Sequence, residues 1–432
     1  MESGNLMNIR KLGFNIVTKI KKSPIDFFIN EFYLSNTDKK KIVSERLVNI
    51  LSIAKNNTQF YSNYNDFKEF PIITKTTLRE EYERFLSNKL NKKKAIITNT
   101  SGSTGQPMTF YLSRRKKYRQ NAEVIFYNNW ANIDIGDPHA YIKVTDIKSK
   151  FKLFVQNEIL MNPKKLTTDW IDEQVNILSK KNLTGIIGVP SAISAIAHRA
   201  KEKNLSKENF QLKGIVSSGE TLKKRDKKIM ESVFGVEPIS RYSTEEFGVL
   251  ATSCPTCGKF HVNDTGYVIE ILSLNSNEHV AVGEHGRVVV TDLFSENMPL
   301  IRFDTGDIAI YGGDSNCSFY SSGILLEEVL GRHVETIYDV NGQPLSAFNI
   351  NGATRDLQTL KQFQFIQNDL TNNYLYIVVT KNFSDIDKNI IKNRFTKILG
   401  VTPKIIIVDE IKASKSGKRP YVISNYKKGS SL

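Results

Sequence analysis

The chain carries the segment Thr98-Asn99-Thr100-Ser101-Gly102-Ser103-Thr104-Gly105-Gln106-Pro107 between two β-type apolar stretches, 95–97 and 108–112. This pattern predicts two strands joined by a flexible loop that is rich in glycine and hydroxyl groups. Glycine lets a backbone approach a ligand closely, and exposed N–H groups and hydroxyls can cradle a phosphate. The Gly-Lys-Ser/Thr of a Walker loop is missing. Taken alone, the segment fits an exposed polar hairpin as well as a phosphate-binding loop.

Strand and helix patterns alternate from residue 141 to residue 234, which predicts a parallel sheet with crossover helices in an α/β fold. Ligands of such sheets bind at the carboxyl ends of the strands. Pro190-Ser191, 217–220 and 243–246 each follow one of these strands, so we expect them to share one pocket. The expected strands, with their turns, are 141–144, 151–155, 185–191 and 214–220, and the expected helices are 114–130, 168–180, 192–203 and 222–234.

The two ends of the chain differ in pattern from its centre. Apolar residues recur at helical spacing over 8–62, and the pattern turns to strands over 260–311. After Gly331-Arg332, strands alternate with a single helix in a segment of typical small-domain size. We therefore expect a large N-terminal domain, 1–331, and a small C-terminal α+β domain, 332–432. The expected elements of the small domain are strands at 363–366, 375–379 and 404–408 and a helix at 386–399.

The composition is that of a globular protein, with 40% hydrophobic and 24% charged residues and a formal net charge of +15. No apolar run approaches the ~20 residues of a membrane span. Three cysteines are too few for a disulfide framework and fit a reducing compartment. No nucleic-acid-binding signature accompanies the positive charge. These features predict a cytoplasmic protein with no nucleic acid partner and no membrane span.

Four stretches resemble, in order, the motifs of the adenylate-forming superfamily, which includes acyl-CoA ligases, luciferases and peptide-synthetase adenylation domains. The loop quoted above resembles its phosphate loop. Arg241-Tyr242-Ser243-Thr244-Glu245-Glu246-Phe247-Gly248 is similar to its Tyr-Gly-x-Thr-Glu motif. Leu300-Ile301-Arg302-Phe303-Asp304-Thr305-Gly306-Asp307 is similar to its Tyr/Phe-x-Thr-Gly-Asp motif, and Leu330-Gly331-Arg332 to its hinge. The whole chain resembles the phenylacetate–CoA ligase-like branch, and within it the members of capsular polysaccharide biosynthesis.

The resemblance implies a large adenylation domain and a small mobile C-terminal domain that supplies a catalytic lysine. It implies ATP-dependent activation of a carboxylic acid as an acyl-adenylate, with Mg²⁺ and release of pyrophosphate. The acyl group would then pass to an amine or hydroxyl, such as an amino sugar or sugar hydroxyl of a surface-polysaccharide precursor. CoA as the acceptor is the alternative, and a catalytically silent binding or scaffold relative is the second alternative.

The resemblance also assigns roles to individual residues. Glu246 would hold Mg²⁺, although Glu245 takes that place if the register shifts by one residue. Lys418 resembles the late catalytic lysine, and only its position after Gly417 separates it from Lys415. The implied phosphate-binding residues are Thr100, Ser101, Gly102, Ser103, Thr104 and Gly105. The residues implied for adenine and ribose are Ser218, Gly219, Glu220, Tyr242, Asp307 and Arg332. The apolar pocket for the acid would be lined by Tyr141, Pro190, Ser191 and Ile193.

A Cys-x-x-Cys-Gly turn, Cys254 to Gly258, is followed by His261 and, farther on, by Cys317. No strand–CxxC–helix context surrounds the turn, so the spacing favours a metal over redox chemistry. Three thiolates and one imidazole make a closed, structural zinc site. Some members of the branch carry zinc at this place. Reduced free cysteines remain the alternative, and His261 can instead face the substrate.

Overall fold

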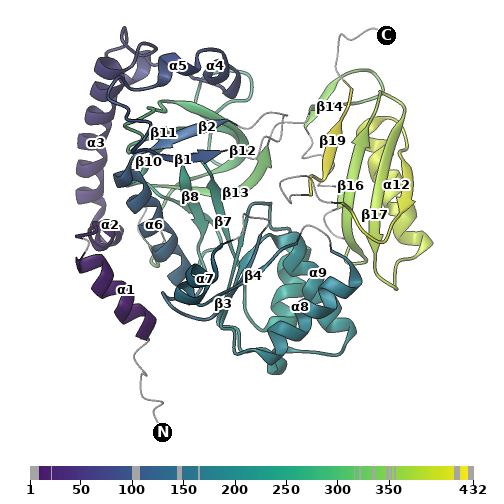
Figure 1. Ribbon diagram of the computed structural model, residues 1–432. Coiled ribbons are helices and arrows are strands. Elements are labelled where there is room, and N and C mark those ends of the chain that lie inside the picture. Colours follow the sequence, from purple (N-terminus) through teal and green to yellow (C-terminus); the bar gives the residue numbers. More distant parts are fainter. Residues whose placement is uncertain are drawn as a thin grey trace.

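The structure is a computed structural model that describes residues 9–20, 22–99, 108–143, 148–163, 166–315, 317–320, 323–332, 336–346, 350, 353–354, 357–412 and 419–426. A mixed sheet of 11 strands forms the centre of the large domain (Figure 1). The predicted α/β fold is confirmed. No helix within these residues is long and apolar enough to cross a membrane.

One half of the large sheet is parallel and the other half is antiparallel, and the change falls between β7 and β8. The spatial order is β10 (Tyr267–Leu272), β11 (His285–Asp292), β12 (Phe303–Asp314), β13 (Ile324–Arg332), β9 (Phe260–Val262), β8 (Gly248–Ser253), β7 (Ile239–Thr244), β6 (Gly214–Ser218), β5 (Gly185–Gly188), β3 (His139–Ile142) and β4 (Glu158–Met161).

Three crossover helices cover the parallel half: α8 (Thr168–Lys180), α9 (Pro190–Glu202) and α10 (Lys224–Phe234). Thr167 begins α8, because its side chain accepts a hydrogen bond from the Trp170 N–H. Helix α9 begins at Pro190, two residues before the predicted start, since proline is favourable in the first turn. The buried faces of these helices and strands form one continuous apolar core.

Helices from the N-terminal third pack against the antiparallel half of the sheet, where they share its core (Figure 1). They are α1 (Ile9–Ile20), α2 (Ile25–Glu31), α3 (Asn36–Asn57), the 3-10 helix η1 (Phe67–Glu69), α4 (Lys75–Glu80), α5 (Tyr82–Phe85) and α6 (Arg114–Asn129). Several begin at side-chain caps, such as Ser35 for α3 and Ser113 for α6. The helical prediction for the N-terminal region is therefore confirmed for 9–20, 25–31 and 36–57.

The strand predicted at 151–155 is wrong: this segment is helix α7 (Lys150–Gln156). Ser149 caps the helix by accepting a hydrogen bond from the Lys152 N–H, and Asn157 ends it in the left-handed conformation. Three of the four apolar residues of α7 are exposed, Phe151, Phe154 and Val155, so the apolar run along the sequence does not mark a buried strand. The strand of this region is β4, which starts one residue after α7.

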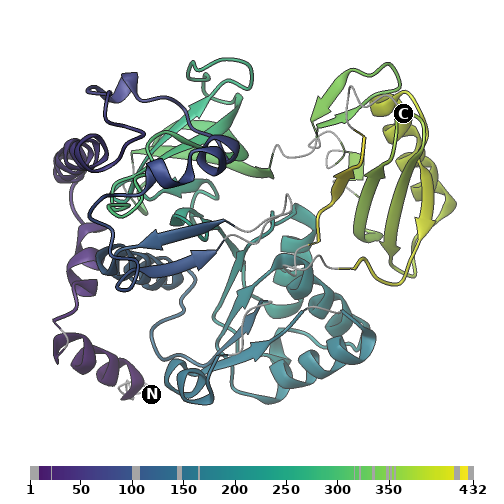
Figure 2. The same ribbon diagram turned by 45° about the horizontal axis from the view of Figure 1, so that its top comes forward.

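A second sheet lies beside the large domain, with α12 (Asp385–Leu399) packed against it through its own apolar core (Figures 1 and 2). The expected elements at 363–366, 375–379, 386–399 and 404–408 are confirmed. Residues 333–335, between the two sheets in the sequence, lie outside the described residues. The domain boundary expected near residue 332 therefore stays a prediction. The strands are β18 (Lys404–Ile407), β17 (Asn373–Val379), β16 (Leu360–Gln367) and β19 (Val422–Ser424), and β14 (Thr336–Tyr338) pairs with β15 (Pro344–Ser346).

Candidate active site

The hairpin predicted around the phosphate-loop motif is formed by β1 (Ile96–Asn99) and β2 (Thr109–Leu112), which pair antiparallel. Asn99 and Thr109 face each other at the end of the hairpin that carries the connecting loop, and the Thr109 hydroxyl donates to Asn99 Oδ1 at 2.9 Å. The predicted phosphate-binding residues, 100–105, lie outside the described residues. The two strands thus place the ends of that loop side by side.

The carboxyl ends of β5, β6 and β7 lie at one edge of the sheet, because these strands are parallel and in register. Glu220 joins two of these ends, since its Oε2 accepts a hydrogen bond from the Ser191 N–H at 3.2 Å. Gly219 has a φ of 88°, a conformation that favours glycine and turns the chain sharply after β6. The structure thereby brings together two of the segments that were expected to share a pocket.

Tyr242 and Asp307 meet across the centre of the sheet. The Tyr242 hydroxyl donates to Asp307 Oδ2 at 2.7 Å, and both residues are buried. Burial, followed by the Asp307 carboxylate, raises the pKa of Tyr242 well above its usual value, so the phenol stays protonated. Arg332 stands opposite Asp307 in the pairing of β12 with β13. Of these predicted adenine- and ribose-binding residues, Asp307 and Arg332 therefore lie on neighbouring strands, and Tyr242 reaches Asp307 from β7.

The two adjacent carboxylates of the turn between β7 and β8 have different surroundings. Glu245 is about half exposed, and its Oε1 lies 3.0 Å from the Lys143 ammonium. Glu246 is buried, and its charge contributes to the raised pKa of Tyr242. Of the two carboxylates considered for the metal, Glu246 is therefore the one that is buried and acts on Tyr242.

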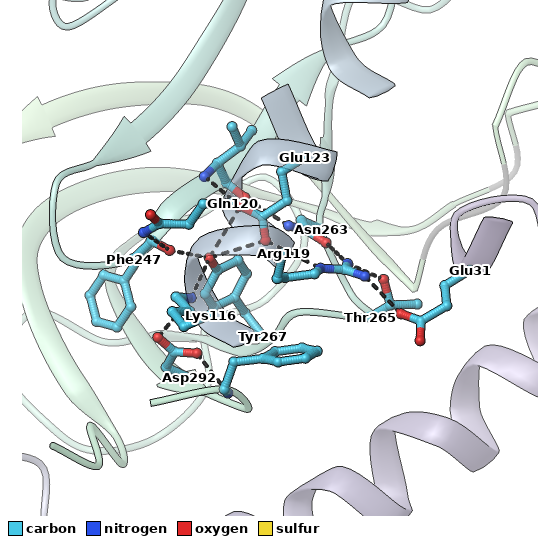
Figure 3. A network of polar contacts seen from close by, with 12 residues as sticks. Glu31, Lys116, Arg119, Gln120, Glu123, Phe247, Asn263, Thr265, Tyr267 and Asp292 are labelled. Atoms are coloured by element: carbon cyan, nitrogen blue, oxygen red, sulfur yellow. Dashed lines mark hydrogen bonds and ion pairs between the residues drawn. The ribbon is translucent and has the colours of Figure 1, made fainter. Parts of the chain in front are cut away.

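A buried polar network that the sequence did not reveal lies on the inward face of α6 (Figure 3). The Lys116 ammonium lies 2.8 Å from Asp292 Oδ2, and both side chains are fully buried. Arg119 pairs with Glu31 at 2.7 Å and with Glu123 at 3.3 Å. Buried charges of this kind are stable only when each has a partner of opposite charge or several hydrogen bonds.

This network holds the turn that carries Glu246. Both Tyr267 and Gln120 donate hydrogen bonds to the carbonyl oxygen of Phe247 (Figure 3). Glu123 Oε2 accepts from the Val249 N–H at 3.1 Å. The backbone on either side of Gly248 is thus fixed from α6 and β10.

Gly248 itself allows the close approach of the network. Its φ is 107°, and a Cβ atom there would lie only 2.6 Å from Glu123 Oε2. A side chain at this position would therefore push the turn away from α6. The close contact with α6 thus explains why position 248 of the Glu246-Phe247-Gly248 triplet is a glycine.

We expect Lys116→Met to lower the free energy of unfolding by about 3–5 kcal/mol, because it leaves the buried Asp292 carboxylate without its cation. Arg115→Met is the matched control on the same helix. Arg115 pairs with Glu296 at the surface, so its loss should cost about 1 kcal/mol or less. Urea unfolding followed by circular dichroism measures both values. Equal losses in the two variants would contradict the importance of the buried pair.

The C-terminal domain reaches the same edge of the sheet through Arg419. Its backbone N–H donates to Glu220 Oε1 at 3.2 Å, and its Nη2 donates to the Pro163 carbonyl at 3.1 Å. Glu410 pairs with the Arg419 guanidinium at 3.6 Å and also accepts from the Leu166 N–H at 2.8 Å. The predicted lysine, Lys418, and its alternative, Lys415, lie outside the described residues.

A cavity of about 220 Å³ lies between the two domains beside these contacts, and it has a balanced set of charges. Burial, together with the neighbouring Arg225, lowers the pKa of Lys223 to about 7. Burial, together with Lys361, lowers the pKa of His198 to about 4. The charged side chains at its wall are Arg199, Glu202, Glu220, Lys223, Arg225, Asp226, Lys361, Asp409, Glu410 and Arg419.

The residues predicted for an acid pocket fall in different places. Pro190 and Ser191 line the cavity, and the Ser191 hydroxyl is buried with no hydrogen-bond partner among the described residues. The Tyr141 ring lies 4.4 Å below the Lys148 ammonium, outside the lining. Ile193 is fully buried in the core beneath α9 and does not line the cavity.

His198 predicts a pH dependence of stability. Its folded pKa of about 4 lies below the unfolded value of about 6.5, so the unfolded chain binds the proton first as the pH falls. Between pH 6.5 and 4, the wild type should lose up to about 3 kcal/mol more than His198→Gln. The exposed His285→Gln is the control and should follow the wild type. Urea unfolding across this pH range tests it, and parallel curves for wild type and His198→Gln would refute it.

The residues of the predicted zinc site are clustered in space. Cys254 Sγ lies 3.8 Å from Cys317 Sγ, and Cys257 Sγ lies 3.4 Å from His261 Nε2. All four atoms lie within 4.8 Å of one another. Burial, with a smaller effect of a nearby lysine, lowers the pKa of His261 to about 4, so its imidazole is neutral at neutral pH.

Comparisons with known proteins agree with this architecture. The family described as the CapK C-terminal domain matches residues 337–425. Protein CapK of Staphylococcus aureus is 22% identical over 415 residues, which cover 90% of this chain and 89% of CapK. Phenylacetate-coenzyme A ligase of Thermus thermophilus is 22% identical over 281 residues, covering 63% of this chain and 62% of that ligase.

Solved structures show the same fold. A 2-hydroxyisobutyryl-CoA ligase in its postadenylation state superposes with a TM-score of 0.73 at 16% identity, with 91% of both chains covered. The same ligase in its thioesterification state superposes less well, with a TM-score of 0.61 and the same coverage. The predicted resemblance to the adenylate-forming superfamily and its phenylacetate–CoA ligase-like branch is confirmed.

Proposed function

Because the chain has the fold and the ordered motifs of an adenylate-forming ligase, we propose that it activates a carboxylic acid as an acyl-adenylate. One observation carries this proposal: Glu220 accepts a hydrogen bond from the C-terminal domain at the edge of the sheet where two of the segments expected to share a pocket meet. The residue that donates this bond, Arg419, directly follows the proposed catalytic Lys418 in the chain.

In the proposed reaction, a carboxylate oxygen of the acid attacks the α-phosphorus of ATP. A new O–P bond forms, the bond from the α-phosphorus to the β-phosphate oxygen breaks, and pyrophosphate leaves with the electron pair. The carboxylate is already a nucleophile, so the protein has to position the reactants and neutralise charge. The residues described below can serve those two purposes.

The nucleoside would lie against Ser218, Gly219 and Glu220, next to the Tyr242–Asp307 pair. The Tyr242 hydroxyl holds one oxygen of the Asp307 carboxylate, which orients the other toward a ribose. Arg332 stands beside Asp307 in the sheet and is proposed to contact ribose or phosphate. The phosphates would bind the loop Thr100 to Gly105, whose two ends are joined by the β1–β2 hairpin.

Glu246 is the residue we propose for Mg²⁺. This ion favours one or two carboxylates together with phosphate oxygens, and it would neutralise charge on the departing pyrophosphate. Glu246 is buried and its turn is fixed by α6, whereas Glu245 is exposed and paired with Lys143. This contrast favours Glu246 over Glu245 for the metal.

Lys418 would bring a cation to the developing charge. Consecutive Cα atoms are about 3.8 Å apart, so the anchoring of Arg419 to Glu220 restricts where the preceding residue can lie. The second half of the reaction would require the C-terminal domain to leave this contact and present another surface. The better fit to a postadenylation structure supports the view that the described arrangement follows the first half-reaction.

The acceptor is proposed to be an amine or hydroxyl of a surface-polysaccharide precursor. This proposal is supported by similarity to CapK over nine-tenths of both chains. CoA is the second candidate, and it is supported by the similarity to phenylacetate-coenzyme A ligase over a shorter region. Both candidates share the adenylation step and differ only in the nucleophile that attacks the acyl-adenylate.

Carboxylate-dependent release of pyrophosphate from Mg²⁺-ATP, measured over a panel of aryl, short aliphatic, hydroxy and amino acids, tests the adenylation step. Glu246→Gln and Lys418→Ala should each lower the rate by about 100-fold or more, since each removes a charge that stabilises the transition state. Glu245→Gln and Lys415→Ala are the matched controls and should stay within about threefold of the wild type. Hydroxylamine traps the acyl-adenylate as a hydroxamate.

Other outcomes of this experiment have definite meanings. Loss of activity in Glu245→Gln but not in Glu246→Gln would move the metal to Glu245. Absence of ATP binding by calorimetry would reject the enzyme and favour a silent binding relative. Once an acid is found, consumption of the CoA thiol identifies a CoA ligase, and a mass increase of an added amino sugar identifies acyl transfer to the sugar.

We further propose that Cys254, Cys257, His261 and Cys317 hold a structural Zn²⁺. In a tetrahedral site with Zn–S bonds near 2.3 Å, sulfur atoms lie about 3.8 Å apart and sulfur and nitrogen about 3.6 Å apart. The distances of 3.8 Å and 3.4 Å in this cluster fit that geometry. Because all four positions are taken by protein, the ion would stabilise the fold and would not bind a substrate.

Elemental analysis of the purified chain should find one zinc per molecule. Cys257→Ser should lower the zinc content and the melting temperature, whereas the exposed His279→Asn should change neither. A strong chelator should reduce the melting temperature of the wild type to that of Cys257→Ser. A metal-free protein whose melting temperature is insensitive to chelator would refute the site.

A further inference from the structure

Helix α1 presents its apolar face to solvent. Its side chains Leu12, Ile16, Val17 and Ile20 are all exposed, and they follow helical spacing along one side. The opposite side carries Phe14, which packs against the core, and the buried Thr18. The helix is therefore amphipathic, but more of its apolar surface faces outward than inward.

Helix α7 adds a second set of exposed apolar side chains next to α1. Phe151, Phe154 and Val155 are exposed, with Phe151 at 76% and Phe154 at 68%. The Arg10 guanidinium donates to the Phe154 carbonyl at 3.2 Å and lies 5.2 Å from the Phe154 ring centre. The two helices lie side by side in Figures 1 and 2.

The apolar side chains of α1 and α7 together form what we call the α1–α7 surface. It holds seven of the 17 large apolar side chains that are exposed in the described part of the chain. Monomeric proteins seldom expose apolar residues in such a concentration without a partner. Its members are Leu12, Ile16, Val17, Ile20, Phe151, Phe154 and Val155.

The charge around this surface is positive. Neither helix contains an acidic residue, whereas α1 and α7 contribute Arg10, Lys11, Lys19, Lys150 and Lys152. Two acidic groups near the helices are paired with lysines, Asp134 with Lys11 and Glu158 with Lys148. An apolar face bordered by cations has the composition of helices that lie in the interface of an anionic lipid bilayer.

We propose that the α1–α7 surface docks the protein on an anionic membrane. The apolar side chains enter the boundary between headgroups and acyl chains, and the lysines pair with the lipid phosphates. The basic residues explain why lipid fits this surface better than a second copy of the chain, which would place two positive surfaces against each other. This inference is independent of the proposed reaction.

Cosedimentation of the full chain with vesicles tests the proposal. The chain should bind vesicles that contain phosphatidylglycerol and bind vesicles of phosphatidylcholine alone much more weakly. Ile20→Gln with Phe151→Gln should lower the partition coefficient at least about tenfold, because two large apolar groups stay in water. Lys150→Gln with Lys152→Gln should lower the partition coefficient by about fivefold for each lysine charge that is removed. This loss should occur only with vesicles that contain phosphatidylglycerol.

Two control variants make the same kinds of substitution, apolar to Gln and Lys to Gln, in the C-terminal domain. Ile386→Gln with Ile407→Gln alters exposed apolar residues of the C-terminal domain, and Lys388→Gln with Lys392→Gln alters exposed lysines of α12. Both should bind vesicles as the wild type does. Because all these positions are exposed, melting temperatures should stay within a few degrees, and lipid-free pyrophosphate release should be unchanged.

The proposal is overturned if the wild type binds neither vesicle, or if the variants of the α1–α7 surface bind as well as the controls. Light scattering adds a third outcome that overturns it. If the wild type dimerises without binding vesicles, and Ile20→Gln with Phe151→Gln makes it monomeric, the surface is an interface between copies of this chain.

Discussion

The carboxylate of Glu220 links the two domains at the edge of the sheet. One of its oxygens accepts the Ser191 N–H at the start of α9, and the other accepts the Arg419 N–H from the C-terminal domain. A hydrogen bond to a charged acceptor is stronger than one between neutral groups, and here both depend on the same ionised group. The position of the C-terminal chain is therefore tied directly to the strand ends that form the candidate site. Neighbouring contacts support this link, such as the pair between Lys361 and Glu202.

Within the large domain, helix α6 fixes the turn that carries Glu246. The polar residues of α6 fix the carbonyl of Phe247 and the N–H of Val249, so the turn with Glu246 cannot shift without breaking several buried bonds. Burying this many charges is costly, and apolar residues of similar volume often pack at least as stably. The charged network contributes directional hydrogen bonds, which restrict the backbone conformation of the turn more than apolar contacts would.

Local patterns predicted the fold well where side chains determine the backbone directly. Spacing located α8, α9 and the β1–β2 hairpin, and the predicted metal ligands around the Cys-x-x-Cys turn lie close together. The prediction failed at 151–155, because a run of apolar residues was taken to be buried although α7 lies at the surface. An exposed apolar helix violates the general rule on which such predictions rest.

The polar network was missed for a related reason. Lys116, Arg119, Gln120 and Glu123 recur on one side of α6, and such a stripe usually faces water. Only the tertiary structure supplies their partners, since Glu31 lies 88 residues before Arg119 and Asn263 lies 144 residues after it. The contact between Glu220 and Arg419 spans 199 residues and leaves no local signal either. Motifs thus supplied the candidate site residues, whereas the hydrogen bonds and ion pairs that position them had no signal in the sequence.

The cysteine cluster has a consequence for the topology of the chain. Cys254 and Cys317 are 63 residues apart, and the intervening segment contains β9 to β12, so an ion bound by both closes a long loop. Closing a loop of that length removes conformational entropy from the unfolded chain, and in the chain-entropy model this is worth about 4 kcal/mol. Part of the stability of the antiparallel half of the sheet would then come from the restricted conformational freedom of the unfolded chain. Contacts between the folded strands do not reveal this contribution.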